Sequence, residues 1–146
     1  MISLKYVSII GFIIGLLSIL TLIDQNSILA TGIAGITVQI LAVLLMLWAR
    51  LTFGRRSFHA AANPTEGGLV TSGPYKFIRH PIYAALLYFI WAGILSHPSK
   101  INFSLGLSAT IGMVIRILAE EHLITQRYPE YSAYAARTKR IIPFVL

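Results

Sequence analysis

Residues Ile28 to Ala49 read ILATGIAGITVQILAVLLMLWA, and this 22-residue stretch contains no charged side chain. A helix of about 20 apolar residues is long enough to cross the hydrocarbon core of a bilayer. The stretch from Tyr6 to Ile23 is also uncharged and nearly as long. The sequence therefore predicts two transmembrane helices in the first third of the chain.

Two weaker apolar stretches follow, from Pro81 to His97 and from Ile101 to Ala119, the second interrupted by Arg116. The chain of 146 residues is 56% hydrophobic and 12% charged, with a mean hydropathy of +0.75. A soluble domain of this size does not hold so much apolar surface. We predict an all-α integral membrane fold with about four transmembrane helices in two hairpins, followed by an amphipathic cytosolic helix at the C-terminus.

The polar stretches divide this single membrane domain into four parts. Lys5 and the apolar run after it are similar to a secretion signal, but the run is long and another span follows, so we expect a retained first helix. Pro129 and Glu130 are typical of the opening turn of a helix, which Pro143 would end. The expected parts are an N-terminal transmembrane hairpin (1–51), a cytosolic loop (52–80), a second hairpin (81–119) and a cytosolic catalytic segment (120–146).

The net charge of +7 is concentrated in two of these parts. Nine basic residues lie in or beside the central loop and the tail: Arg50, Arg55, Arg56, Lys76, Arg79, Arg127, Arg137, Lys139 and Arg140. Because basic loops stay in the cytoplasm, we expect a multi-pass protein whose central loop and C-terminus both face the cytoplasm. Attraction to anionic lipid headgroups explains the basic excess better than nucleic-acid binding, so membrane lipids and no nucleic acid are the expected partners.

The chain has no cysteine, which excludes disulfides, thiolate metal sites and cysteine nucleophiles. With four scattered histidines as the remaining soft ligands, we predict no metal site. Gly11, Gly15, Gly32 and Gly35 have spacings that allow close contact between helices, so the first hairpin is interpreted as a packing scaffold. A role of this hairpin as a substrate gate stays open.

Adjacent carboxylates at Glu120 and Glu121 end the last apolar stretch, where charges are costly unless they are paired or used. Arg116 lies one helical turn before Glu120 and can pair with it. One interpretation is that these two residues only neutralise each other while Glu121 faces water. The other is that the carboxylates belong to a functional site, and the sequence does not say which of them would face a ligand.

Arg79, His80 and Tyr83 lie at the start of the third apolar stretch, and the two rings can face the same cavity. A helix N-terminus at Pro81, together with Arg79, favours an anionic group, whereas the glutamates favour a cationic one. A ligand with both charges, such as S-adenosylmethionine, would fit between them, although spacing alone does not single it out. Interfacial anchoring is the alternative interpretation of these rings.

The stretch from Leu69 to Tyr83, LVTSGPYKFIRHPIY, followed by Glu120-Glu121 and then by Tyr131, Tyr134, Arg137 and Pro143, resembles the isoprenylcysteine carboxyl methyltransferase family. The wider superfamily includes phospholipid methyltransferases. The resemblance implies S-adenosylmethionine as the cofactor and a lipid-like acceptor that enters from the bilayer. It also implies cofactor contacts by Tyr75, Arg79, His80, Pro81, Tyr83, Glu120, Glu121, Tyr131 and Tyr134.

The same resemblance implies three catalytic residues, Arg137, Glu120 and Glu121, with Arg137 placed to hold a substrate carboxylate. The acceptor could be a carboxylate of the isoprenylcysteine type or an amine of the phospholipid type. One alternative is an NADPH-dependent membrane reductase of the sterol reductase type, in which Arg55, Arg56 and Arg79 would hold phosphate groups. A non-catalytic membrane protein is the other alternative, and the sequence does not indicate the oligomeric state.

Overall fold

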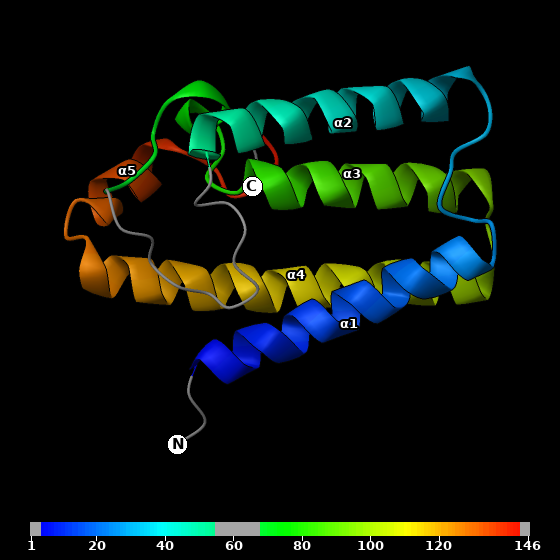
Figure 1. The fold of residues 1–146 in the computed structure, drawn as a ribbon, viewed down its shortest axis with the longest axis horizontal. Helices are drawn as coiled ribbons and strands as arrows, with labels where there is room; N and C mark the ends of the chain where they lie inside the picture. Colours follow the sequence, from blue (N-terminus) through cyan, green and yellow to red (C-terminus); the bar gives the residue numbers. More distant parts are fainter. Residues whose placement is uncertain (1–3, 55–67, 144–146) are drawn as a thin grey trace.

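The computed structural model describes residues 4–54 and 68–143, with the side chains of Leu4 and Lys5 left out of the description. These residues form five α-helices and one short 3-10 helix (Figure 1). Arg55 and Arg56, and with them much of the expected 52–80 loop, lie outside the described residues. In chain order the elements are α1 (Leu4–Asp24), α2 (Ile33–Phe53), η2 (Gly73–Lys76), α3 (Pro81–Ser96), α4 (Lys100–Arg127) and α5 (Tyr131–Arg137).

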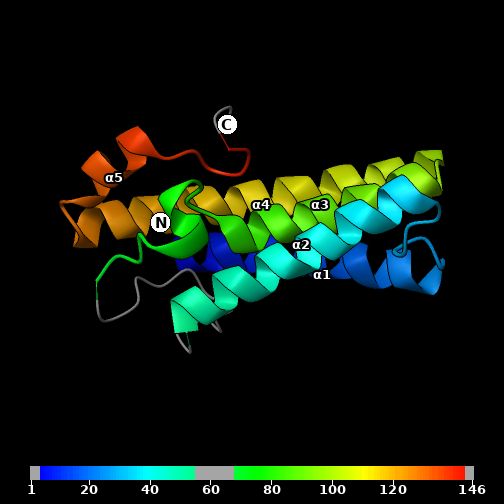
Figure 2. The ribbon, with the colours of Figure 1, turned by 90° about the horizontal axis from the view of Figure 1, so that it is seen from above.

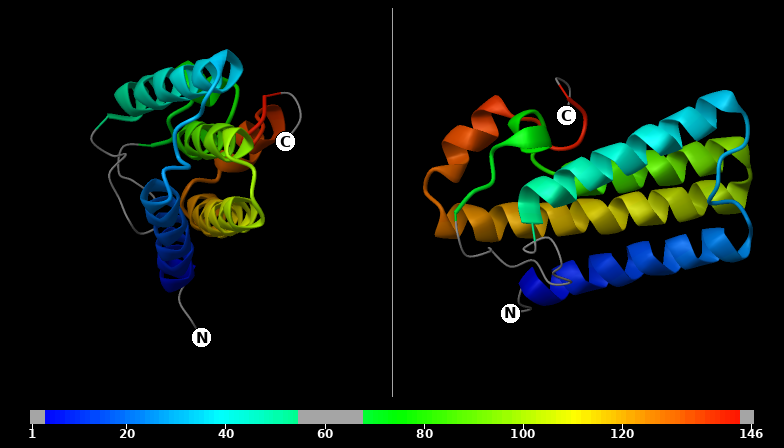
Figure 3. Two further views of the ribbon diagram at one scale, coloured as in Figure 1. Left: turned by 90° about the vertical axis from the view of Figure 1, so that its right-hand side faces the viewer. Right: turned by 45° about the horizontal axis from the view of Figure 1, so that its top comes forward.

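The all-α membrane fold is confirmed, with three helices long and apolar enough to cross a bilayer: α1, α2 and α4. Helix α3 is apolar but has only 16 residues. The packing differs from two separate hairpins, because α1 lies along α4 and α2 lies along α3 (Figures 1 and 3). Each helix of the first predicted hairpin therefore contacts a helix of the second, rather than its neighbour in sequence.

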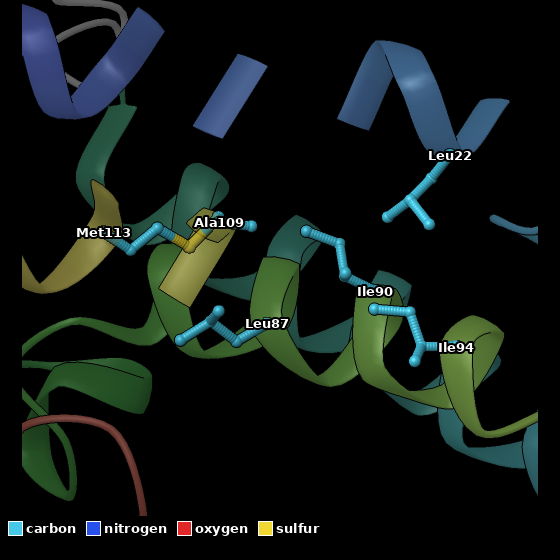
Figure 4. Packing of buried hydrophobic residues seen from close by; sticks show 6 residues of the cluster. All are labelled: Leu22, Leu87, Ile90, Ile94, Ala109 and Met113. Atoms are coloured by element: carbon cyan, nitrogen blue, oxygen red, sulfur yellow. The ribbon is translucent and has the colours of Figure 1, made fainter. Parts of the chain in front are cut away.

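Large aliphatic side chains from α1, α3 and α4 form the core of the bundle. It contains Leu22, Leu87, Ile90, Ile94, Ala109 and Met113 (Figure 4). Large apolar side chains are also abundant on the outside, such as Ile33 (88% exposed) and Leu51 (83% exposed). A helix that is apolar on all sides is typical of a bilayer environment. The outer surface therefore suits lipid.

Helix α2 begins five residues later than the apolar run that predicts it, and the Gln39 side chain explains the late start. Residues before Ile33 form a turn instead, which this side chain holds. Its amide oxygen accepts a hydrogen bond from the backbone N–H of Ala30 at 2.9 Å. Its amide nitrogen donates to the carbonyl oxygens of Ile28 (2.8 Å) and Phe89 (3.0 Å). One buried side chain thus joins the turn, α2 and α3.

We expect Gln39→Ala to lower the free energy of unfolding by about 3 kcal/mol, because the buried N–H of Ala30 and two partly buried carbonyl oxygens would lose a hydrogen bond. Thermal unfolding of the purified protein in detergent measures the effect. Gln25→Ala is the matched control. Gln25 is exposed, and its hydrogen bonds to Thr21 and Ser27 use only its backbone atoms. Equal melting temperatures for the two variants would contradict the role given to Gln39.

Two predicted boundaries near the C-terminus are wrong. Helix α4 continues without a break past Ala119 to Arg127, so both glutamates lie within a regular helix. Helix α5 ends at Arg137 rather than near Pro143, and Thr138 after it is extended. The reason is tertiary: Ile78 and Lys139 form a parallel β-bridge, which draws the tail out of the helical conformation. Figure 2 shows α5 lying at the end of the bundle where α2 ends and α3 begins.

Candidate active site

A cavity of about 400 Å³ lies at this end of the bundle, between α1, α2, α3, α4, η2 and α5. Its volume is within the range of small-molecule sites. The lining contains an apolar part and a part rich in charged and aromatic side chains. The polar side chains of the lining are Arg50, Tyr75, Arg79, His80, Tyr83, Arg116, Glu120, Tyr128, Tyr131 and Tyr134.

The Gly73-Pro74 turn positions the start of α3 and Tyr75 against the end of α2. Gly73 has a φ of +56°, and a Cβ atom built on it would lie 2.6 Å from the Thr52 hydroxyl oxygen. Only glycine combines that backbone conformation with that close approach. Pro81 then opens α3, as predicted, where its missing N–H costs nothing.

His80 and Tyr83 face the same cavity, as their spacing predicts, with ring centroids 5.8 Å apart. The Tyr83 hydroxyl donates a hydrogen bond to Oε1 of Glu120. His80 Nδ1 lies 3.9 Å from the other carboxylate oxygen, Oε2. Among the described residues Oε2 accepts no hydrogen bond, so this oxygen is the one available to a ligand in the cavity.

Arg116 is a buried charge inside a membrane helix, and it is fully engaged. Its Nη2 lies 3.3 Å from Glu120 Oε1, and its Nε donates to the Tyr83 hydroxyl at 3.1 Å. The guanidinium also lies 5.3 Å from the centroid of the Phe12 ring in α1. The predicted ion pair between Arg116 and Glu120 is therefore present. It does more than neutralise charge, because it fixes Glu120 Oε1 and leaves Oε2 without a hydrogen bond.

Glu121 points away from the cavity and does not line it. Its carboxylate lies 2.9 Å from Arg79 Nε, 3.2 Å from His80 Nε2 and 3.0 Å from Arg140 Nη2. The interpretation in which Glu121 faces water is therefore wrong, whereas its contact with a cofactor stays a prediction. Glu121 joins α4, the start of α3 and the tail at one point.

The tail beyond α5 pairs with the segment before α3, which sequence reasoning did not predict. The backbone N–H groups of Arg79 and His80 donate to the carbonyl oxygens of Lys139 (2.7 Å) and Arg140 (3.0 Å). The Tyr88 hydroxyl donates to the carbonyl oxygen of Ile141 at 2.7 Å. This pairing brings loop and tail together at one end of the bundle and holds α5 over the cavity.

Three tyrosines from η2 and α5 line the cavity as the resemblance implies. The Tyr134 hydroxyl donates to the carbonyl oxygen of Tyr75 at 2.7 Å. Burial raises the pKa of Tyr75 and Tyr131 well above the ordinary value and raises the pKa of Tyr134 to about 12. These phenols stay neutral at physiological pH and cannot act as bases there. The Tyr131 hydroxyl is buried and has no hydrogen-bond partner in the described part of the chain.

Arg137 is exposed and does not line the cavity, so the structure does not bring it to the other predicted site residues. Arg137 is the last residue of α5, one turn after the buried Tyr134, and its side chain is exposed. The arginines that do line the cavity are Arg50, Arg79 and Arg116.

For the methyl transfer that the resemblance implies, we expect Arg137→Ala to stay within about threefold of the wild type, since surface charges away from a site contribute little. The measurement is transfer of a radiolabelled methyl group from S-adenosylmethionine to the lipids of membranes that contain the protein. Arg79→Ala is the matched control, for which a much larger loss is expected. A loss of more than tenfold in folded Arg137→Ala would restore the catalytic role that the resemblance implies.

The first two helices supply a wall of the cavity, which sequence analysis treated as scaffold. Helix α1 contributes Gly11, Phe12, Gly15, Leu16 and Ile19, and α2 contributes Met46, Arg50 and Phe53. No motif marks these residues, and apart from the glycine spacing and Arg50 they read as ordinary membrane helix. Their place depends on α1 packing along α4, which local sequence does not encode.

Among the described residues no group of three or more His, Asp or Glu side chains could hold a metal ion.

Comparison with known proteins gives one family and three relatives. The profile of the phospholipid methyltransferase family matches residues 28–131, more than two thirds of the chain. The chain is similar to the nickel-cobalt-cadmium resistance protein NccN of Alcaligenes xylosoxydans xylosoxydans, with 31% identity over 119 residues, 80% of this chain and 50% of NccN. It is also 31% identical over 117 residues to the cobalt-zinc-cadmium resistance protein CzcN of Cupriavidus metallidurans, which covers 80% of this chain and 49% of CzcN.

The third relative is protein-S-isoprenylcysteine O-methyltransferase B of Arabidopsis thaliana, with 33% identity over 121 residues, 76% of this chain and 58% of that protein. The chain thus spans about half the length of the curated relatives it matches. No solved structure matches it significantly.

Proposed function

We propose that this chain, which belongs to the phospholipid methyltransferase family, methylates a lipid-like acceptor at the cytosolic face of the membrane with S-adenosylmethionine as donor. The observation that carries the proposal is Glu120. It is the one carboxylate among the described residues that lines the cavity, and two neighbours donate to its Oε1 while its Oε2 accepts no hydrogen bond from the described residues. A carboxylate so placed attracts an ammonium or sulfonium group.

The remaining lining fits the other groups of this donor. The N-terminus of α3 favours its carboxylate end, because the first N–H groups of a helix attract anions, whereas the Arg79 guanidinium is already paired with Glu121. The faces of Tyr75, Tyr131 and Tyr134 suit the adenine ring, and the buried Tyr131 hydroxyl offers an unused donor. When bound, S-adenosylmethionine would supply a methyl group on a sulfonium sulfur, and attack of the acceptor on the methyl carbon would release S-adenosylhomocysteine.

The work of the protein in such a transfer is to orient the groups and to exclude water. Tyr83 and Arg116 fix Glu120, while the tail and α5 cover the cavity. A carboxylate acceptor needs no base. An amine acceptor must lose a proton, and Glu120 is the group placed to accept it, since the neutral tyrosines cannot.

Calorimetric titration of the purified protein with S-adenosylhomocysteine, the product, tests this proposal. We expect one site per chain, and a screen of carboxylate and amine lipids with labelled donor then identifies the acceptor class. NADPH is titrated in parallel. Binding of NADPH without binding of S-adenosylhomocysteine would overturn the proposal in favour of a reductase.

The cytosolic position of the site is part of the proposal and rests on charge. Basic side chains such as Lys76, Arg127 and Lys139 gather at the cavity end, whereas the opposite turns carry only Asp24 and Lys100. The chain has no cysteine, so single cysteines report orientation directly. We expect Ser132→Cys to react with an impermeant maleimide only after cells are opened and Gln25→Cys to react in intact cells. The reverse pattern would place the site outside.

A further inference from the structure

The cavity has an apolar part that the charged site does not use. Its walls come from α1 (Phe12, Leu16, Ile19), α2 (Met46), α3 (Leu86) and α4 (Met113). Space lined by such side chains does not hold ordered water, because water needs polar partners there. The space is continuous with the part that contains Glu120, so a ligand in it would lie beside the reacting groups.

Gly15 in α1 keeps this space open. Gly15 is buried and lines the cavity, yet a Cβ atom built on it would meet no atom within 4 Å. Gly11, one turn earlier, is different, because a Cβ atom there would lie 2.5 Å from the backbone oxygen of Gly112. Gly11 is therefore required for the close approach of α1 and α4, whereas Gly15 is not required for packing.

The wall beside Gly15 keeps apolar surface uncovered. Phe12 and Leu16 line the cavity and are 40% and 42% exposed. Helix α1 is one of the helices apolar and long enough to cross the bilayer, so this exposed surface faces lipid tails. We therefore expect an apolar chain to enter the cavity beside α1.

We propose that Gly15 is a specificity-determining residue: the space left by its missing side chain holds the apolar acyl or prenyl chain of the acceptor, and the size of residue 15 limits that chain. The identity of the chain as part of a methyl acceptor rests on the proposed function. The place for an apolar chain rests on the cavity alone. Each methylene that a larger residue excludes weakens binding about fourfold, the equivalent of about 0.8 kcal/mol.

Photolabelling with a lipid probe tests the proposal without any need for methyl transfer. The purified protein is placed in phosphatidylcholine nanodiscs with a small fraction of phosphatidylethanolamine that carries a diazirine at the end of one acyl chain. Mass spectrometry then locates the labels. We expect wild type to be labelled at the inner wall, at Leu86 and Met113, and at the lipid-facing Leu17.

In Gly15→Phe we expect inner-wall labelling to fall at least tenfold while Leu17 labelling stays constant, with Gly15→Ala between this variant and wild type. Ile13→Phe is the matched control, because it adds a ring on the exposed side of the same helix, outside the cavity lining. Unchanged inner-wall labelling in Gly15→Phe would overturn the proposal. If Gly15→Phe does not fold, Leu86→Trp narrows the space from α3 and carries the same expectation.

Titration with S-adenosylhomocysteine separates this inference from the proposed function. Folded Gly15→Phe is expected to bind it within threefold of wild type, and a loss of binding would assign the space to the donor and overturn the proposal. If wild type does not bind S-adenosylhomocysteine but its inner-wall labelling depends on residue 15, the proposed function fails and the site for the apolar chain stands.

Discussion

Glu120→Gln is expected to weaken binding of S-adenosylhomocysteine about 100-fold, the largest effect of any single change at the site. Hydrogen bonds to a charged group contribute about 1.5–3 kcal/mol, and Glu120 Oε2 is placed to receive the cationic end of the ligand. Calorimetric titration measures the loss. The same variant is expected to lose about 3–5 kcal/mol of stability, because buried Arg116 would keep its charge without its partner.

A double variant separates these two effects. Arg116→Met combined with Glu120→Gln removes both charges from the interior, and replacing a buried ion pair by neutral groups is often nearly neutral for stability. We expect the double variant to recover much of the lost stability, measured by thermal unfolding, while binding stays as weak as in Glu120→Gln. Recovery of binding together with stability would show that Glu120 only supports the fold.

The sequence predicts the membrane class and the residues at the cavity mouth, because both depend on local properties. Uncharged runs long enough to cross a bilayer identify α1 and α2, and Pro81 identifies the start of α3. The spacing of His80 and Tyr83 gives their common face, since residues three apart on a helix are neighbours. Pairing of Arg116 with Glu120 follows from the same spacing.

The division of labour between Glu120 and Glu121 could not be predicted in this way. Consecutive residues on a helix point about 100° apart, so the two carboxylates can lie in different surroundings. Which one faces the cavity depends on where α3 and the tail lie around α4. That arrangement is set by the pairing of residues 77–80 with residues 138–140, between segments about 60 positions apart.

The end of α5 shows the same limit. Arg137 to Arg140 continue a helical pattern, but the backbone of Lys139 bonds to Phe77 and Arg79 instead. Tertiary hydrogen bonds thus outweigh a local preference of at most about 1 kcal/mol per residue. The cavity wall on α1 is similar, because glycine spacing indicates close packing at Gly11 but does not distinguish Gly15, which faces open space.

Glu121→Ala is the variant with the second large expected effect. We expect it to weaken the pairing of the tail with the start of α3. Removing this carboxylate leaves the nearly buried Arg79 without its ion-pair partner and His80 Nε2 without its close carboxylate contact, which costs about 3 kcal/mol. The pairing of the tail with the start of α3 should then open more often. Trypsin cleaves after Arg137, Lys139 and Arg140, so faster cleavage there, relative to wild type under native conditions, measures the opening.

Arg140→Ala is the control for Glu121→Ala. The Arg140 side chain is 45% exposed, so its loss should lower the free energy of unfolding by less than about 1 kcal/mol.

A ligand that binds only the form in which the tail is paired with the start of α3 raises the population of that form by mass action. Saturating S-adenosylhomocysteine should therefore return Glu121→Ala to near wild-type resistance to trypsin, with full stoichiometry and weaker affinity. At similar concentrations, S-adenosylhomocysteine should not bind to Glu120→Gln. If Glu121→Ala instead resisted trypsin as wild type does and still failed to bind, Glu121 would contact the ligand directly, and the two adjacent carboxylates would share one role rather than dividing site and support between them.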